Sequence, residues 1–270
     1  MKKCLVLFYC VIFILCMTKQ SVILFAQPTR KETQQEKFPE EVLSKVLFFV
    51  NSSSVSYYGK SRFGWWNVYV FIGQNGELIH VDEETKEVSL VIYKLKNIST
   101  QQRISIEEAK NIVIKWLTER KIQLKEWMLE EQGIYKAGNL NRYQFKWVKK
   151  TPKGIYLPCL LSVNIMDNGE ILSFSRIERP VTISLEPKVS EEEAIKVSLK
   201  EVKQKFEEKL TQFRLINKKL FVWFHHNTGK QQLYWEIELE GIGEKEPYKH
   251  HNRVNVRIDA HTGEIIAMIW

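Results

Sequence analysis

The sequence predicts an α+β protein made of three successive units, each with one helix packed on a small antiparallel sheet. Two observations lead to this prediction. A helix-start pattern at residues 104–109 recurs at residues 189–194, and self-similarity of this kind is typical of repeat architectures. Each helix is followed by stretches rich in aromatic and β-branched residues, with turn residues between them, which favours antiparallel strands.

The helices are predicted from their start signals. Ser105 and Ser190 each precede a glutamate, Glu108 or Glu193, in the spacing of a reciprocal N-terminal cap. Apolar residues then follow at helical spacing, which gives each helix one stripe for a core. These residues are Ile112, Val113, Trp116 and Leu117 in the first case and Ile195, Leu199, Val202 and Phe206 in the second. A fainter start lies at residues 38–42, where Pro39 fits the first helical turn.

The strands are predicted from residue type and from the turns that separate them. Residues 68–72, 143–147 and 233–237 are rich in aromatic and β-branched side chains, as strands usually are. Asn-Gly at 75–76 and at 168–169 is a hairpin dipeptide, because both residue types tolerate a positive φ. Residues 227–229 give a slightly longer turn of the same kind.

A closing string ends each unit. Residues 254–258 alternate apolar and polar side chains before Asp259 opens a turn, and related strings stand at 81–88 and 165–171. Asp259 with His261 could form part of a metal or acid–base site. The favoured interpretation is a turn in which Asp259 accepts backbone N–H bonds and His261 points to solvent. Asp82 and Asp167 recur at the equivalent turns, and three copies of one active site would be unusual.

The N-terminus has the pattern of an export signal. Lys2 and Lys3 precede the uncharged residues 4–17, and this run is shorter than the roughly twenty residues that a membrane-spanning helix needs. We expect residues 1–26 to be a signal peptide cleaved after Ala26, and the alternative is a retained N-terminal membrane anchor. Either alternative places the rest of the chain outside the cytoplasm.

The composition limits the kinds of protein and of partner that the sequence is compatible with. The chain is 44% hydrophobic and 27% charged, which favours folded domains over disorder. Its net charge of +8 falls to +5 without the three lysines of residues 1–26, and the remaining signs are interspersed. This predicts a mixed solvated surface, with weak attraction to anionic cell-surface polymers as the alternative. The sequence has no basic stripe with aromatic stacking residues, so nucleic acid is not an expected partner.

Two histidine pairs are candidate metal ligands. His225-His226 and His250-His251 could converge if their strands are neighbours. Adjacent residues on a strand point to opposite faces, however, so each pair supplies at most one ligand. The sequence has no His-Glu-x-x-His motif, nucleophile elbow, phosphate-binding loop or dinucleotide fingerprint. We therefore assign no catalytic, cofactor-binding or metal-binding residue.

Cysteine and aromatic residues favour structural roles. Cys159 is the one cysteine beyond residues 1–26 and lies in an apolar run, which indicates a small core side chain. Trp65-Trp66, near Tyr57-Tyr58, could form an exposed patch for a protein or glycan. Core packing is the favoured interpretation of both tryptophans.

The repeating unit resembles the PepSY domain, including the YcdB/YcdC-type repeats of secreted bacterial proteins. The resemblance rests on Ser-x-Glu-Glu-Ala at 190–194, the tyrosine-containing strand at 233–237, and Val-x-Ile-Asp-Ala-x-Thr-Gly-Glu-Ile at 256–265. It implies tandem PepSY-like, cystatin-like units at residues 101–180 and 181–270 and a degenerate unit at 27–100. The first unit departs from the pattern at Lys86, where glycine is expected, and the middle unit lacks Thr-Gly.

The resemblance implies a non-catalytic binding module with no cofactor. We expect a secreted or anchored protein that modulates or inhibits a secreted peptidase or a cell-wall hydrolase, through sheet edges or the sheet face opposite each helix. A structural or adhesive envelope protein without a hydrolase partner is the alternative. The sequence leaves open the identity of the partner and the oligomeric state.

Overall fold

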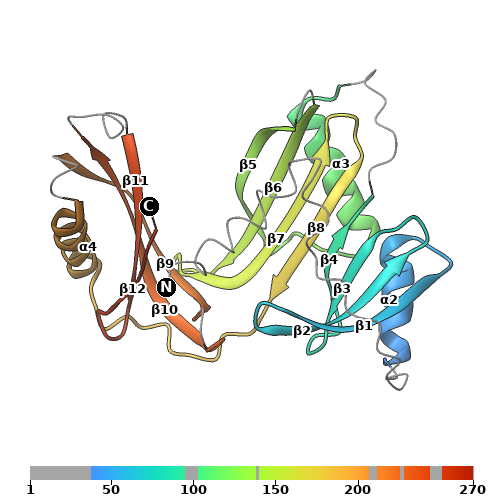
Figure 1. Ribbon diagram of the computed structural model, residues 1–270, viewed down its shortest axis with the longest axis horizontal. Helices are drawn as coiled ribbons and strands as arrows, with labels where there is room; N and C mark the ends of the chain where they lie inside the picture. Colours follow the sequence, from blue (N-terminus) through green and yellow to red (C-terminus); the bar gives the residue numbers. More distant parts are fainter. Residues whose placement is uncertain are drawn as a thin grey trace, which may run out of the picture.

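The computed structural model describes residues 38–94, 103–137, 140–206, 212–225, 228–243 and 251–269. Within these residues the chain forms three helices and twelve strands, in an order of one helix and four strands that occurs three times (Figure 1). The fold is therefore mixed α+β, as the sequence predicts. The expected leader, residues 1–26, lies outside the described residues. In the described ranges no helix is long and apolar enough to cross a membrane.

The elements fall into three sets. The first set is α2 (Glu40–Val50), β1 (Val55–Phe63), β2 (Trp66–Gly73), β3 (Leu78–Asp82) and β4 (Val88–Ile92). The second is α3 (Ile106–Glu119), β5 (Met128–Ala137), β6 (Leu140–Lys150), β7 (Tyr156–Met166) and β8 (Ile171–Glu178). The third is α4 (Glu191–Phe206), β9 (Gln212–Phe224), β10 (Gln231–Ile242), β11 (His251–Asp259) and β12 (Ile265–Ile269).

All twelve strands join in one sheet, in the order β1-β2-β3-β4-β8-β7-β9-β10-β11-β12, and β5 and β6 branch from β7. The last strands of the first two sets, β4 and β8, pair antiparallel with Val91 opposite Phe174. The third set is attached by a single parallel pair, Tyr156 and Phe221. The sequence led us to expect a separate small sheet for each unit. The sheet is continuous instead, because pairing β4 with β8 satisfies backbone groups that two isolated edges would leave unpaired.

The described residues form two hydrophobic cores, where the expected units would give three. One core takes buried residues from α2 and α3 and from strands of both first sets. In that core the rings of Phe49 and Trp116 meet edge to face at 5.6 Å, above the fully buried Phe174. The other core is formed by the third set together with Ile155, from the chain between β6 and β7. The first two sets therefore share one core, and the third set forms most of the other.

The helix starts follow the predicted capping chemistry. The Ser105 hydroxyl accepts from the Glu108 N–H, and the Glu108 carboxylate accepts from the Ser105 N–H at 2.7 Å. Ser190 and Glu193 make the same two hydrogen bonds, at 3.2 and 2.9 Å. The first helix starts at Glu40, and Pro39 is its N-cap residue without a side-chain cap. This weaker start agrees with the fainter pattern in the sequence.

The hairpin turns use the expected positive-φ residues. Gly76 and Gly169 have φ of 83° and 87°, which a glycine adopts without steric cost. Lys86 has φ of 57°, and the equivalent position in the third set is Gly263, at 80°. Both residues donate a backbone hydrogen bond of 2.9 Å to the carbonyl of the aspartate that opens the turn, Asp82 or Asp259. Lys86 thus keeps the turn that the sequence motif assigns to glycine.

Candidate binding surfaces

Helix α4 covers the third part of the sheet and leaves part of its apolar stripe uncovered. Ala194, Ser198, Val202 and Phe206 are buried, and the helix packs on β10 and β11. Ile195 and Leu199 lie on the next stripe, are half-buried and pack against the border of the third core. In Figure 1 this helix lies at one end of the molecule, away from α2 and α3. Its outer side is therefore open to a partner over the described residues.

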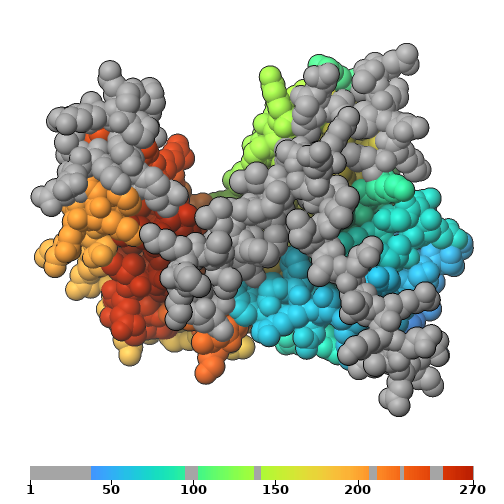
Figure 2. All heavy atoms as spheres, in the orientation of Figure 1, coloured from blue at the N-terminus to red at the C-terminus, as the bar shows by residue number. Residues whose placement is uncertain are grey.

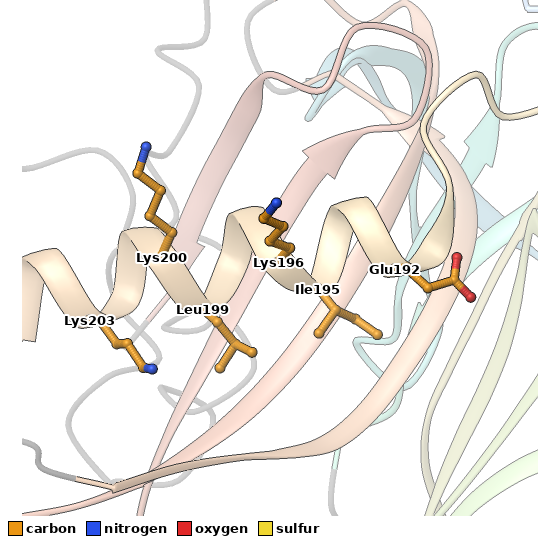
Figure 3. Close-up of a pocket in the computed structure, with 6 residues that line it drawn as sticks. All are labelled: Glu192, Ile195, Lys196, Leu199, Lys200 and Lys203. Carbon is orange, nitrogen blue, oxygen red and sulfur yellow. The ribbon is translucent and has the colours of Figure 1, made fainter.

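A shallow groove of about 600 Å³ runs along this side of α4. Its lining residues are Glu192, Ile195, Lys196, Leu199, Lys200 and Lys203. Figure 3 shows Ile195, Leu199 and Lys203 pointing to one side of the helix and Lys196 and Lys200 to the other. The groove therefore offers an apolar strip next to the Lys203 ammonium group, with two further lysines across the helix. Such a surface suits a partner with apolar side chains set among carboxylates.

A second pocket, of about 260 Å³, lies where the third set meets the first. It is formed by the β1–β2 turn, the chain after β8, and the β9–β10 turn, with Trp65, Trp66, Arg179 and Phe224 in its lining. The ring of Trp66 meets Phe224 edge to face at 5.2 Å, and Trp65 stacks on Phe224 at 6.3 Å. In the space-filling view the third set stands apart from the first two sets on one side of the molecule and meets them on the other (Figure 2).

The predicted aromatic group of Tyr57, Tyr58, Trp65 and Trp66 is divided in the structure. Tyr57 packs on the first core, 4.8 Å from the ring of Phe38. Tyr58 is 55% exposed. Trp65 and Trp66 belong to neither core. The core-packing interpretation is therefore wrong for the two tryptophans, which hold two distant parts of the chain together.

A buried ion pair lies beside these tryptophans. The guanidinium group of Arg179, just after β8, binds the carboxylate of Asp82 and also lies 2.6 Å from Glu84. The Arg179 side chain is 6% exposed, and its guanidinium carbon lies 5.8 Å from the ring of Trp66. Sequence reasoning missed this arginine because its acidic partners are far away in the chain. The only local signal was its position between a strand end and Pro180.

Another ionic cluster joins β5, β6, β7 and β9. The Glu130 carboxylate accepts from Lys219 at 2.6 Å, from Lys150 at 3.0 Å, and from the hydroxyl of Tyr156. Burial raises the pKa of Glu130, but the hydrogen bonds from Lys219, Tyr156 and Lys150 outweigh it and lower the pKa to about 2. Glu130 therefore stays ionised at neutral pH. Its cluster ties the third set to the second.

Asp259 is a turn cap, as the sequence predicts. Its carboxylate accepts from the backbone N–H groups of His261 and Thr262 at 2.7 and 2.8 Å and from the Gln232 side chain. Burial opposes ionisation, and these hydrogen bonds nevertheless hold the pKa of Asp259 below its ordinary value. The prediction for His261 is wrong. Its ring is half-buried, and its Nε2 atom is buried without a hydrogen-bond partner among the described residues.

The other two turn aspartates differ from each other. Asp82 caps its own turn, with hydrogen bonds of 2.9 Å from the backbone of Glu84 and Thr85. Asp167 accepts instead from the backbone N–H of Asn141, next to the β5–β6 turn, at 2.9 Å. The middle turn is shorter, so the Asp167 carboxylate reaches a neighbouring hairpin. The three aspartates thus serve as structural acceptors at related positions.

The predicted histidine pairs fall partly outside the described residues. His226, His250 and the side chain of His251 are not described. His225 lies at the end of β9, with its Nδ1 atom 3.2 Å from the Thr228 hydroxyl. In the described ranges no group of three histidine, cysteine, aspartate or glutamate side chains could hold a metal ion.

Cys159 is a core residue, as expected. Its side chain is 5% exposed and packs in the core shared by α2 and α3. Burial raises the pKa of the thiol above its ordinary value. A protonated, buried thiol is a poor nucleophile, so Cys159 acts in packing.

The fold and these surfaces define a class of protein: a mixed α+β protein whose perturbed carboxylates serve turn caps and ion pairs, with an open helix groove at one end. Residues 188–269 match the PepSY family model, described as "Peptidase propeptide and YPEB domain". The third set is therefore a PepSY-type domain, and it contains α4 with its groove. The family named from the sequence is confirmed for this part of the chain.

The chain is similar to a solved structure, the "Bacillus megaterium YpeB C-terminal domain", which is one of three matching chains, with 16% sequence identity and a TM-score of 0.48. The similarity covers 87% of this chain and 98% of that one. No curated protein matches the chain.

Proposed function

We propose that this chain is an extracytoplasmic, non-catalytic binding module that restrains a secreted peptidase or a cell-wall hydrolase. The main support is that α4 and its groove lie inside the domain that matches a peptidase-propeptide family. We further propose that all three sets of one helix and four strands are PepSY-like units. The leader at residues 1–26 would secrete the chain or anchor it to the membrane.

The groove beside α4 is the proposed docking site on the hydrolase. Ile195 and Leu199 would bury apolar area of the partner, at about 25 cal/mol per Å². Lys196, Lys200 and Lys203 flank them, against the single acid Glu192. The expected partner surface is therefore a small apolar patch rimmed by carboxylates, because opposite charges steer association and select the partner.

A titration of hydrolase activity tests this proposal. Purified chain is added to the secreted and envelope fractions of the source cells, and hydrolysis of casein and of purified peptidoglycan is measured. We expect saturable inhibition of one activity, and we expect Leu199→Asp to weaken it at least tenfold, since it places a carboxylate in an apolar contact. Ile134→Asp on β5 controls for the added charge, because Ile134 is 57% exposed and far from α4 along the sheet. A thermal melt of Leu199→Asp controls for folding, because Leu199 also packs against the third core.

Two results would contradict the proposal. If hydrolase activities stayed constant at every concentration of the chain, the proposed hydrolase partner would be contradicted. If Leu199→Asp and the wild-type chain inhibited equally, the groove would not be the docking site.

An adhesive envelope protein is the second candidate function. The net charge of +5 beyond residues 1–26 favours it, because anionic wall polymers attract such a surface. It predicts co-sedimentation with purified cell wall that salt abolishes. Co-sedimentation without any effect on hydrolases would favour this function over the first.

A further inference from the structure

In the part of the chain that the structure describes, three strands pair on one side only, and one of them lacks charged residues. A fourth strand, β9, touches β7 at a single residue pair and carries Arg214, Lys218 and Lys219. Within the described residues β1 pairs only with β2, β5 only with β6 and β12 only with β11. β1 carries Lys60 and Arg62, and β5 carries Glu130, Glu131 and Lys136. The residues of β12 are Ile-Ile-Ala-Met-Ile. Charged residues protect sheet edges against pairing with another strand, so β12 is the unprotected edge.

The chain already shows how an equivalent edge is covered. β4, β8 and β12 each follow the turn that starts at Asp82, Asp167 or Asp259. In the first two sets these strands pair with each other, with Leu90 opposite Ser175, Val91 opposite Phe174 and Ile92 opposite Ser173. Val91 and Phe174 both hold the fourth position of their strands. The β4–β8 pairing is therefore symmetric about this fourth position.

We propose that β12 pairs in the same way with β12 of a second copy of this chain. Met268 holds the fourth position of β12, so it would lie opposite Met268 of the second copy, with Ala267 opposite Ile269. Met268 pairs with Val256 on β11 and packs on the third core, on the side of α4. The dimer would join the two sheets edge to edge and cover the uncharged strand of each copy.

The helix layer supports a second copy as the occupant. In the first half Phe49 of α2 meets Trp116 of α3 across the β4–β8 pair, and the Arg120 guanidinium lies 5.7 Å from the Phe49 ring. Counted from the capping residues Ser105 and Ser190, Trp116 corresponds to Glu201 and Arg120 to Lys205. When the helices are aligned on their buried residues Val42, Ala109 and Ala194, Phe49 also corresponds to Glu201. The same geometry between two copies would therefore place the two Glu201 carboxylates near each other, with Lys205 of each copy beside Glu201 of the other. The two lysines would then neutralise the two carboxylates across the two-fold axis.

Sedimentation velocity of the full chain over a concentration series tests the proposal. We expect a monomer–dimer equilibrium that Met268→Lys abolishes, since it sets two ammonium groups against each other at the two-fold axis. Lys205→Glu should weaken the dimer about tenfold, which corresponds to about 1.4 kcal/mol. The double variant Glu201→Lys with Lys205→Glu should restore it. Lys203→Glu makes the same charge change on the groove side of α4 and should leave the dimer unchanged.

Disulfide trapping tests the register in a way that does not depend on stability. With Cys4, Cys10 and Cys16 replaced by serine, Met268→Cys should form a disulfide-linked dimer under mild oxidation. Ile265→Cys, three positions from the axis, should not. A chain that is monomeric at every concentration would overturn the proposal. So would a dimer that persists in Met268→Lys, or one in which Lys205→Glu has no more effect than Lys203→Glu.

Discussion

The first two sets form one half of the molecule and the third set forms the other. Every set has the same order of elements, but the sets meet their neighbours in different ways. The first two sets share a core, in which Phe49, Trp116 and Phe174 interlock above the paired strands β4 and β8. The third set forms a second core, to which the second set adds Ile155, and it joins the rest through one strand pair, aromatic ring contacts and ion pairs. The first contact is a fused interior, and the second is a surface contact.

This difference has a consequence for stability. A shared interior cannot lose one set without exposing the apolar surface of the other, so the first two sets should unfold together. The third set loses mainly polar and aromatic contacts when it separates, and such contacts contribute modestly. We therefore expect two cooperative units, residues 38–178 and the PepSY-type domain after them.

Among the variants considered, Phe174→Ala should cause the largest loss of stability. Phe174 is fully buried between the rings of Phe49 and Trp116, and truncation of such a side chain costs about 4 kcal/mol. Hydrogen exchange measured by mass spectrometry should show lost protection across α2 and α3 and unchanged protection across α4. Ile258→Ala in the third core is the control and should give the reverse pattern. Equal loss across both halves in either variant would contradict the division.

Arg179→Ala should have the second largest effect, confined to the junction. It removes the partner of a buried Asp82 carboxylate, which costs about 3 kcal/mol when one member of a buried pair is lost. Exchange should rise at the β1–β2 and β9–β10 turns, where Trp66 and Phe224 meet. Arg176→Ala is the control, because Arg176 and its partner Glu178 are 24% and 32% exposed, whereas the Arg179 side chain is 6% exposed. Similar effects of the two variants would mean that the buried pair does not hold the junction.

The helices, strands and turns within each set could largely be predicted from the sequence, but the contacts between sets could not. The capping pair Ser105–Glu108 and the turn at Asp259 are local, since their partners lie within a few residues. The β4–β8 pairing and the Arg179–Asp82 ion pair join residues far apart in the chain. Periodicity and turn chemistry carry no signal for such pairs. The α4 groove could be predicted in part. The apolar stripe of the helix is visible in the sequence, but the side of it that the sheet leaves uncovered is not.

Lowering the pH should weaken the first half selectively. His80 on β3 is 7% exposed, and burial lowers its pKa to about 4. The folded state thus binds fewer protons than the unfolded state between pH 6.5 and about 4, so stability is full above pH 6.5 and falls as the pH drops through this window. The expected loss is on the order of 2 kcal/mol. The equivalent residue of the third set is Arg257, which pairs with Glu236 at 2.8 Å.

Denaturant unfolding at pH 7 and pH 5 measures this effect. His80→Leu should remove most of the pH dependence of the first transition and leave the second transition unchanged. A pH dependence that survives the substitution would assign the effect to other groups.

The smallest expected effect concerns the closing turn that both halves share. Lys86 adopts the left-handed conformation that Gly263 adopts in the third set, and a residue with a Cβ atom pays about 1 kcal/mol there. Lys86→Gly removes this strain but also the contact of the ammonium group with the Tyr69 ring, at 5.1 Å, so we expect a net stabilisation of about 0.5 kcal/mol. Lys86→Ala separates the two contributions, because it keeps the strain and loses the contact, and it should destabilise. Gly263→Ala should cost about 1 kcal/mol in the second transition, that of the third set. If Lys86→Gly and Lys86→Ala gave the same melting temperature, the strain at this turn would be negligible, and the lysine would fit it as well as glycine does.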